Sequence, residues 1–285
     1  MERLTKFRFT NLDKILYPKL DVKKLGVIEY YIKIAPKMLS FLAKRIVVLN
    51  RFPDGVEEKG FYEKDSPGGT PPWVETFARF SETSGREINY IICNDLNTLL
   101  WLANLAALEM HIVLSQIESY EKPDQLLFDL DPEPPAGFNE AVEVAFTLKE
   151  NLDSLGFKSY IKTSGKKGLH VLLPLVGDYN FSQTREFVHQ FGKYLARDSD
   201  LVVSELSQSQ DPGKVYVDYL QNSVGRTMIC PYSLRATPQA TVSTPIEWDE
   251  LKGLNPEELN VFTVKERKKN PWAGFWEDRQ RLEVG

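Results

Sequence analysis

The sequence has few cysteines, no excess of positive charge and no long apolar run. Its two cysteines, Cys93 and Cys230, lie far apart in apolar segments, which excludes a disulfide framework and a cysteine-rich zinc site. No run approaches the roughly 20 apolar residues that span a bilayer, and the N-terminus lacks the apolar core of a signal peptide. We therefore expect a cytoplasmic protein with two buried thiols and no membrane partner.

The charge balance is acidic, with 35 Lys and Arg against 40 Asp and Glu and a formal net charge of -5. This balance excludes a generally basic nucleic-acid-binding surface, so any contact with phosphate must come from local basic clusters. Acidity does not exclude an enzyme that acts on nucleic acid, because a cluster of catalytic carboxylates itself adds negative charge. The hydrophobic content of 42% is ordinary for a globular protein.

Helical and strand periodicities follow one another along the chain and predict an α+β fold, with helices covering mixed β-sheets. We expect a single domain over residues 1–285. A helical turn is expected at 10–18, and helices at 23–43, 95–110, 139–155, 182–196 and 256–269. Pro36 should kink or split the first helix. Strands are expected at 45–52, 60–64, 87–93, 111–116, 126–131, 158–163, 169–176, 201–205, 214–221 and 228–234.

Residues 126–132, Leu-Leu-Phe-Asp-Leu-Asp-Pro, place two aspartates at the end of an apolar strand. Strand side chains alternate between faces, so Asp129 and Asp131 should project together while Phe128 and Leu130 enter a core. Two neighbouring carboxylates repel each other unless a cation lies between them, and Mg²⁺ or Mn²⁺ prefers such oxygen ligands. The alternative is a strand end at which Asp131 caps a turn.

Two further features could complete a site. Asp218 lies in an alternating strand, and with the first two aspartates it could hold two metal ions for phosphoryl transfer. Residues 164–170, Ser-Gly-Lys-Lys-Gly-Leu-His, form a tight turn in which Ser164, Lys167 and His170 supply donors for an anion. The turn does not match the Walker A pattern, so a P-loop nucleotidase is not indicated. Separately, these features are also typical of a surface aspartate and an ordinary glycine hairpin.

In their order and spacing, these motifs resemble the polymerase domain of bacterial DNA ligase D, which belongs to the archaeo-eukaryotic primase superfamily and serves non-homologous end joining. The matching segments are Phe-Asp-Leu-Asp-Pro at 128–132, Thr-Ser-Gly-x-x-Gly-x-His at 163–170, Val-Asp at 217–218 and Pro-Tyr-Ser-Leu-Arg at 231–235. The resemblance extends from residue 10 to at least Trp248. It implies a primase-like fold with the active site on central strands. DNA and template contacts are expected within residues 1–120, the metal and nucleotide site within 121–250, and a tail at about 270–285.

The resemblance implies roles for matching residues. Asp129, Asp131 and Asp218 are expected to bind two Mn²⁺ or Mg²⁺ ions, with His111 beside them at the end of a buried helix. Nucleotide contacts are expected from Ser164, Lys167, His170 and Arg235. Contacts to a DNA 5′-phosphate are expected from Asn11, Lys14 and Lys24, and contacts to the template from Phe61, Tyr62 and Arg51. Seen alone, His111 or one of the two aromatics could instead be a core residue, and Lys24 could be part of a solvated helix start.

The implied activity is that of a nucleotidyltransferase that extends a primer 3′-hydroxyl at gaps and double-strand-break ends, using NTPs or dNTPs with a ribonucleotide preference. Expected partners are DNA carrying a 5′-phosphate, a Ku-type end-binding protein and, because no ligase or nuclease motif is present, a separate ATP-dependent ligase. We expect association with the nucleoid. Residues 207–213 lack a basic residue that some members carry, and Gln221 stands where relatives can have arginine. These departures leave the bridging of two ends and one triphosphate contact open. The alternatives are a de novo primase, a non-catalytic DNA-end adaptor and a two-metal nuclease.

Overall fold

The chain divides into two units, each assembled from three separate segments. The computed structural model describes residues 5–81 and 84–282. Unit 1 comprises Met1–Val113, Thr227–Ser243 and Glu257–Lys268, and unit 2 comprises Leu114–Arg226, Thr244–Pro256 and Lys269–Gly285. Each unit combines β-sheet with helices, so the α+β class predicted from the sequence is confirmed.

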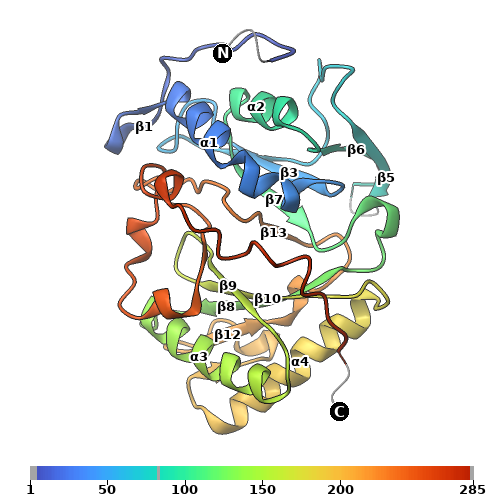
Figure 1. The fold of residues 1–285 in the computed structure, drawn as a ribbon, viewed down its shortest axis with the longest axis vertical. Helices are drawn as coiled ribbons and strands as arrows, with labels where there is room; N and C mark the ends of the chain where they lie inside the picture. The colour runs from blue at the N-terminus through green and yellow to red at the C-terminus, as the bar shows by residue number, and fades with distance from the viewer. Residues whose placement is uncertain (1–4, 82–83, 283–285) are drawn as a thin grey trace. The chain divides into compact units, whose positions relative to one another are not determined.

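Unit 1 is a sheet in the order β13-β7-β3-β6-β5, with β4 also paired to β3. Helices α1 and α2 contact each other (Figure 1). Tyr31 of α1 donates a hydrogen bond to the Leu108 carbonyl of β7. A small β1–β2 hairpin precedes α1. The elements are β1 Ile15–Tyr17, β2 Val22–Lys23, α1 Lys24–Leu42, β3 Ile46–Arg51, β4 Phe61–Glu63, β5 Thr76–Ser81, β6 Arg86–Ile92, α2 Leu96–Asn104, β7 Ala107–Val113 and β13 Thr227–Ile229.

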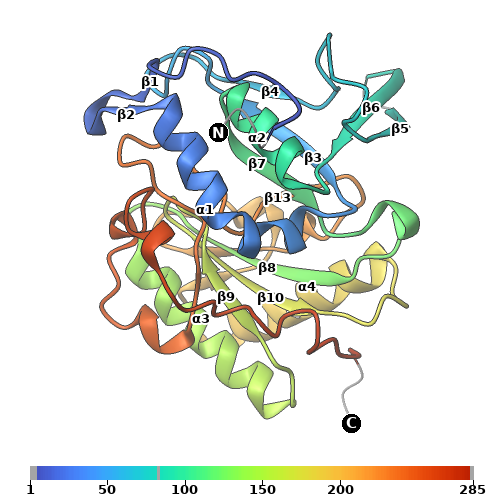
Figure 2. The same cartoon turned by 45° about the horizontal axis from the view of Figure 1, so that its top comes forward.

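Unit 2 is a sheet in the order β11-β12-β8-β10-β9-β14, and helices α3 and α4 both cover one of its faces (Figures 1 and 2). The Phe128 ring of β8 lies against Phe187 and Phe191 of α4, with ring centroids 6.4 and 5.4 Å away. The core of unit 2 therefore lies between the central strands and the helices. The elements are β8 Gln125–Pro132, α3 Phe138–Ser154, β9 Tyr160–Thr163, β10 Leu169–Pro174, α4 Phe181–Asp198, β11 Val202–Val203, β12 Val215–Asp218 and β14 Pro245–Ile246.

Several predicted elements differ in the structure. The helix expected at 95–110 ends at Asn104, because Ala106 adopts a left-handed backbone (φ 56°) and the chain then enters β7. The turn expected at 10–18 contains strand β1, and residues 256–269 contain only short 3₁₀ turns. Helix α1 continues through Pro36 without being split.

The C-terminal aromatic segment packs back on unit 2. Trp272 and Phe275 are 2% and 0% exposed, and both rings contact Tyr160 of β9. The Trp272 indole also donates to the Ile161 carbonyl at 3.0 Å. The tail is thus part of the unit 2 core.

The cysteines and the helices were also compared with the sequence-based expectations. Cys93 and Cys230 are both buried free thiols, as expected. Within the described ranges, no helix combines the length and apolar character required to cross a membrane.

Candidate functional site

A row of three polar residues crosses the centre of the unit 2 sheet. In the antiparallel register, Asp218 of β12 lies directly opposite Asp129 of β8, and His170 of β10 lies opposite Asp129 on its other side. Directly opposed residues share a face with Cβ atoms about 4.5–5.5 Å apart. Asp131 is two residues beyond Asp129 and points to the same face. The structure therefore brings Asp129, Asp131, Asp218 and His170 together, on the face opposite α3 and α4.

The carboxylates of this row are buried, and burial disfavours their negative charge. The Asp129 carboxylate is 7% exposed, and its Oδ1 lies 3.3 Å from Nε2 of His170. Burial raises the pKa of the Asp218 carboxyl, a shift that the Leu220 amide donating to it at 2.9 Å only partly offsets. Like charges near one another in a low dielectric favour either protonation or capture of a cation. The row is thus poised to bind positive charge.

The side chains of the row already have protein partners. Asp129 faces His170, and Asp218 accepts from the amide of Leu220 and from the Gln221 side chain. Among residues 5–81 and 84–282, no three aspartate, glutamate, histidine or cysteine side chains form a ready metal cage. The donor set nonetheless has the chemistry of a hard divalent cation, because it offers three carboxylates from one face.

The glycine turn at residues 164–168, next to this row, is held by hydrogen bonds from its backbone amides to a serine hydroxyl. Ser164 Oγ accepts from the backbone amides of Lys166 and Gly168 at 3.2 and 3.1 Å, and Gly165 adopts φ +74°. A Cβ on Gly168 would lie 2.6 Å from the Leu130 carbonyl oxygen, so only glycine allows the turn to approach β8. Ser164 therefore shapes the turn, and its predicted contact with a nucleotide stays a prediction.

Lys167 lies at the outer end of the same turn. Its Nζ is 3.6 Å from Glu133 Oε2, and the lysine side chain is half exposed. A pair this exposed contributes little to stability. Lys167 therefore remains able to exchange its carboxylate partner for another anion.

In unit 1, His111 lies in the middle of strand β7, not at the end of a helix as the sequence analysis expected. It pairs with Val48 of β3 and Ile229 of β13. Its ring is 5.7 Å from the Tyr62 ring, and its Nε2 is 3.4 Å from Oε2 of Glu109. The sequence analysis did not single out Glu109, although its i, i+2 spacing places it on the same strand face as His111.

Arg235 belongs to the same cluster in unit 1. Its Nε forms an ion pair with Glu109 Oε1 at 3.1 Å, and the side chain is 10% exposed. Its own carbonyl accepts a hydrogen bond from Tyr17 at 3.0 Å. The other predicted nucleotide contacts, Ser164, Lys167 and His170, belong to unit 2.

The residues predicted to bind a 5′-phosphate form one local structure in unit 1. The Lys14 amide donates to the Asn11 carbonyl, and the Lys24 amide donates to the Lys14 carbonyl at 2.8 Å. Lys24 is buried at the start of α1, so the solvated reading of this residue is wrong, and its Nζ donates to the Asn104 carbonyl. Burial, followed by the charges of Lys14 and Arg51, lowers the pKa of Lys24. Lys14 and Arg51 already pair with Asp54 and Glu63, so an anion bound here would compete with these two carboxylates.

The residues predicted to bind the template lie at the β3–β4 edge. Phe61 and Tyr62 are 43% and 62% exposed, so the alternative in which one is a core residue is wrong. As strand neighbours they point to opposite faces, and Tyr62 lies opposite Asn50 while Phe61 lies opposite Arg51. The Arg51 guanidinium is 5.3 Å from the Phe61 ring centroid. The two aromatics therefore offer two separate stacking surfaces.

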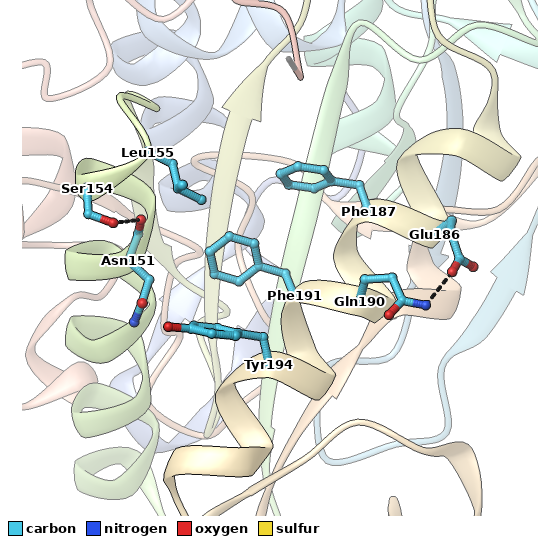
Figure 3. A pocket seen from close by; sticks show the side chains of 8 residues that line it. All are labelled: Asn151, Ser154, Leu155, Glu186, Phe187, Gln190, Phe191 and Tyr194. Carbon is cyan, nitrogen blue, oxygen red and sulfur yellow. Dashed lines mark hydrogen bonds between the residues drawn. The ribbon is translucent and has the colours of Figure 1, made fainter. Parts of the chain in front are cut away.

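A cavity of about 530 Å³ lies between α3 and α4, away from the carboxylate row (Figure 3). The rings of Phe187, Phe191 and Tyr194 line one side, facing the end of α3. Phe128 packs on this side, while its neighbour Asp129 points to the other face of the sheet. The remaining lining residues are Asn151, Ser154, Leu155, Glu186 and Gln190. Without clustered acidic or basic groups, this cavity does not suit phosphoryl chemistry.

Comparison with known proteins points to one family. Residues 23–273 match the family described as "LigD, primase-polymerase domain". The chain is 36% identical over 275 residues to "Bifunctional non-homologous end joining protein LigD" of Bacillus subtilis, covering 95% of this chain and 44% of the relative. It is 34% identical over 270 residues to the "Multifunctional non-homologous end joining protein LigD" of Mycolicibacterium smegmatis, covering 94% of this chain and 35% of the relative. The chain thus spans less than half the length of these relatives.

A solved structure gives the same result. The chain is similar to the "Polymerase Domain from Mycobacterium tuberculosis Ligase D in complex with DNA", with a TM-score of 0.87 and 30% identity. The similarity covers 97% of this chain and 100% of that structure.

Proposed function

We propose that this chain, which belongs to the LigD primase-polymerase domain family, extends primer ends during non-homologous end joining. Membership of this family makes it a nucleotidyltransferase of the polymerase and primase type. The primer 3′-hydroxyl attacks the α-phosphate of a nucleoside triphosphate. The new phosphodiester bond forms as the bond to pyrophosphate breaks.

The observation that carries this proposal is the row of Asp218, Asp129 and His170, with Asp131 on the same face. Asp129, Asp131 and Asp218 would hold two Mn²⁺ or Mg²⁺ ions. When bound, these ions lower the pKa of the attacking hydroxyl and neutralise charge on the leaving phosphates. The carboxylates would hold the ions on one face of the sheet, where strand register fixes the spacing of Asp129 and Asp218.

Nucleotide binding is assigned to four residues. His170 lies beside Asp129 and can donate to a phosphate oxygen, and Lys167 can leave Glu133 to do the same. Ser164 holds the turn in place and would contact the nucleotide as the turn adjusts. Arg235 suits a phosphate because its planar guanidinium presents several donors at once. A preference for ribonucleotides and stimulation by Mn²⁺ follow from the family resemblance.

DNA contacts are assigned to unit 1. Asn11, Lys14 and Lys24 would bind a 5′-phosphate, whose negative charge would oppose the burial and the repulsion that lower the pKa of Lys24. Phe61 and Tyr62 would stack on bases, a contact worth about 1–3 kcal/mol per base. We expect the DNA substrate to be gapped or broken, with a Ku-type end-binding protein and an ATP-dependent ligase as partners.

Primer extension on gapped DNA tests the function. The substrate carries or lacks a 5′-phosphate at the gap, Mn²⁺ is present, and NTPs are compared with dNTPs. We expect extension that favours NTPs, weakens without the phosphate and falls more than about 100-fold in the Asp129→Ala/Asp131→Ala variant. Circular dichroism checks that this variant is folded.

Other outcomes of this experiment would indicate a different activity or remove one of the assigned residue roles. Synthesis without any primer would indicate a de novo primase, and release of nucleotides from the DNA would indicate a nuclease. DNA binding without extension would leave only an end adaptor. Extension indifferent to the 5′-phosphate would retain the polymerase and remove the role of Lys14 and Lys24.

A further inference from the structure

Glu109 is a buried carboxylate at the centre of unit 1. It lies on β7, is 1% exposed and occupies the same strand face as His111. A buried charge is costly unless all of its lone pairs find donors. The partners that satisfy Glu109 therefore indicate what the residue does.

The two carboxylate oxygens of Glu109 serve different partners. Oε1 accepts from the Ala236 amide at 3.1 Å and lies 3.1 Å from Nε of Arg235. Oε2 accepts from Nδ2 of Asn50 at 2.9 Å and lies 3.4 Å from Nε2 of His111. Each oxygen thus holds one predicted active-site residue together with one neutral donor.

The environment of Glu109 keeps it ionised. Burial alone would raise its pKa, but the hydrogen bond from His111, the charge of Arg235 and the bonds from Asn50 and Ala236 together hold the pKa well below its usual range. An ionised carboxylate only accepts hydrogen bonds. Nε2 of His111 must therefore carry a proton, which in the neutral ring leaves Nδ1 as the acceptor.

The same argument applies to Arg235. The ion pair keeps Nε of Arg235 3.1 Å from Glu109 Oε1, and because the guanidinium is a rigid planar fork, this contact limits where its two terminal nitrogens can lie. Tyr17 anchors the backbone of the same residue through its carbonyl. The position of the guanidinium is therefore constrained, through its charge and its backbone, before any ligand arrives.

We propose that Glu109 is a positioning residue that sets the tautomer of His111 with one carboxylate oxygen and the orientation of Arg235 toward the nucleotide phosphates with the other. The part concerning Arg235 rests on the proposed polymerase function. The part concerning His111 rests on unit 1 alone.

The first test measures the His111 ring directly. The chain contains only three histidines, so ¹⁵N-histidine spectra are simple to assign with one His→Asn variant per residue. The wild type should show His111 protonated at Nε2. In Glu109→Gln the amide oxygen can stay on Arg235 while the amide nitrogen turns to His111, so the proton should move to Nδ1. An unchanged tautomer would overturn this part of the proposal.

The second test measures ATP binding in the presence of Mn²⁺ by calorimetry. Glu109→Gln should raise the Kd about tenfold, as expected when one charge-assisted contact loses its alignment. In an Arg235→Gln background the same substitution should change the Kd less than about twofold, because its effect passes through Arg235. Equal effects in both backgrounds would show a merely structural role. If Arg235→Gln alone is unstable, the double variant still removes both partners of the pair.

The control variant is Tyr30→Phe, which removes a buried hydroxyl of the same unit that bonds the Tyr232 carbonyl at 2.8 Å. It should lower thermal stability without changing the His111 spectrum or the ATP Kd. A wild type that binds ATP but extends no primer would refute the proposed function, while the tautomer measurement would still decide the role of Glu109.

Discussion

Asp218 shows how a single residue can be well placed for function and poorly placed for stability. Burial raises its pKa above the ordinary value of 3.8. The folded chain therefore binds this proton more tightly than the unfolded chain does. As pH rises through 3.8, ionisation of Asp218 lowers the unfolding free energy. This loss of stability is complete at pH values above the raised pKa of Asp218 in the folded chain.

The Asp218→Asn variant should therefore be more stable than the wild type at pH 7. Asparagine keeps an oxygen for the Leu220 amide and removes the buried charge. We expect Tm to rise by about 2 °C while primer extension is lost. Differential scanning calorimetry measures the shift, and a Tm below that of the wild type would contradict the argument.

A metal titration of the wild type and Asp218→Asn separates the effect of burying Asp218 from its proposed role as a metal ligand. Mn²⁺ should raise the Tm of the wild type in proportion to its binding free energy, and should raise that of Asp218→Asn much less. An equal rise in both proteins would remove Asp218 from the ligand set.

At the scale of residues, local patterns predicted part of the site. The i, i+2 spacing of Asp129 and Asp131 placed both on one face, and the structure agrees. Glu109 was missed because its role depends on Arg235, a partner far along the chain that no local pattern reveals. The alternative of a solvated Lys24 was wrong for the same reason, since the buried position of this residue involves the distant Asn104.

At the scale of elements, the register between strands brings the residues of the site together. Helix α3 ends at Ser154, one residue before the predicted end, and Gly156 adopts φ +81° just beyond it. By contrast, helix-forming residues continue through Met110, yet β7 forms because it pairs with both β3 and β13. Tertiary pairing overrides local helix propensity at this segment. Strand β5 was not predicted, and its alternating exposed and half-buried residues give only a weak signal.

Gly168→Ala tests the close approach of the turn to β8. The new methyl group would meet the Leu130 carbonyl at 2.6 Å and Asp131 Oδ1 at 3.1 Å, so the turn must move away. We expect a loss of about 1–3 kcal/mol in unfolding free energy, measured by urea titration, and a loss of extension. Gly177→Ala is the matched control, because nothing lies within 4 Å of its Cβ, and it should stay within about 0.5 kcal/mol.

At the scale of the whole molecule, the chain passes between the two units five times, at residues 113/114, 226/227, 243/244, 256/257 and 268/269. Neither unit is a contiguous stretch of sequence. The sequence analysis expected one domain over residues 1–285, and sequence patterns alone give no sign of these crossings, because they occur in short connections without linker composition.

The C-terminal tail should be required for the stability of unit 2. Phe275 is fully buried against Tyr160, so Phe275→Ala should cost about 3–5 kcal/mol in unfolding free energy. The neighbouring Glu277 is exposed, and Glu277→Ala should leave the unfolding curve unchanged. A Phe275→Ala variant as stable as this control would show that the tail merely rests on the surface.

The interleaved segments also set the order in which the protein can mature during synthesis. Unit 1 needs Val264, and unit 2 needs Trp272 and Phe275, all buried and all near the end of the chain. The ribosome therefore has to release the chain past Val264 before the core of unit 1 can close, and past Phe275 before the core of unit 2 can close. Tyr160 of β9 is made well before Trp272 and Phe275, the residues whose rings pack against it. Premature termination would leave two open cores rather than one finished unit, and such fragments are natural targets for chaperones and proteases.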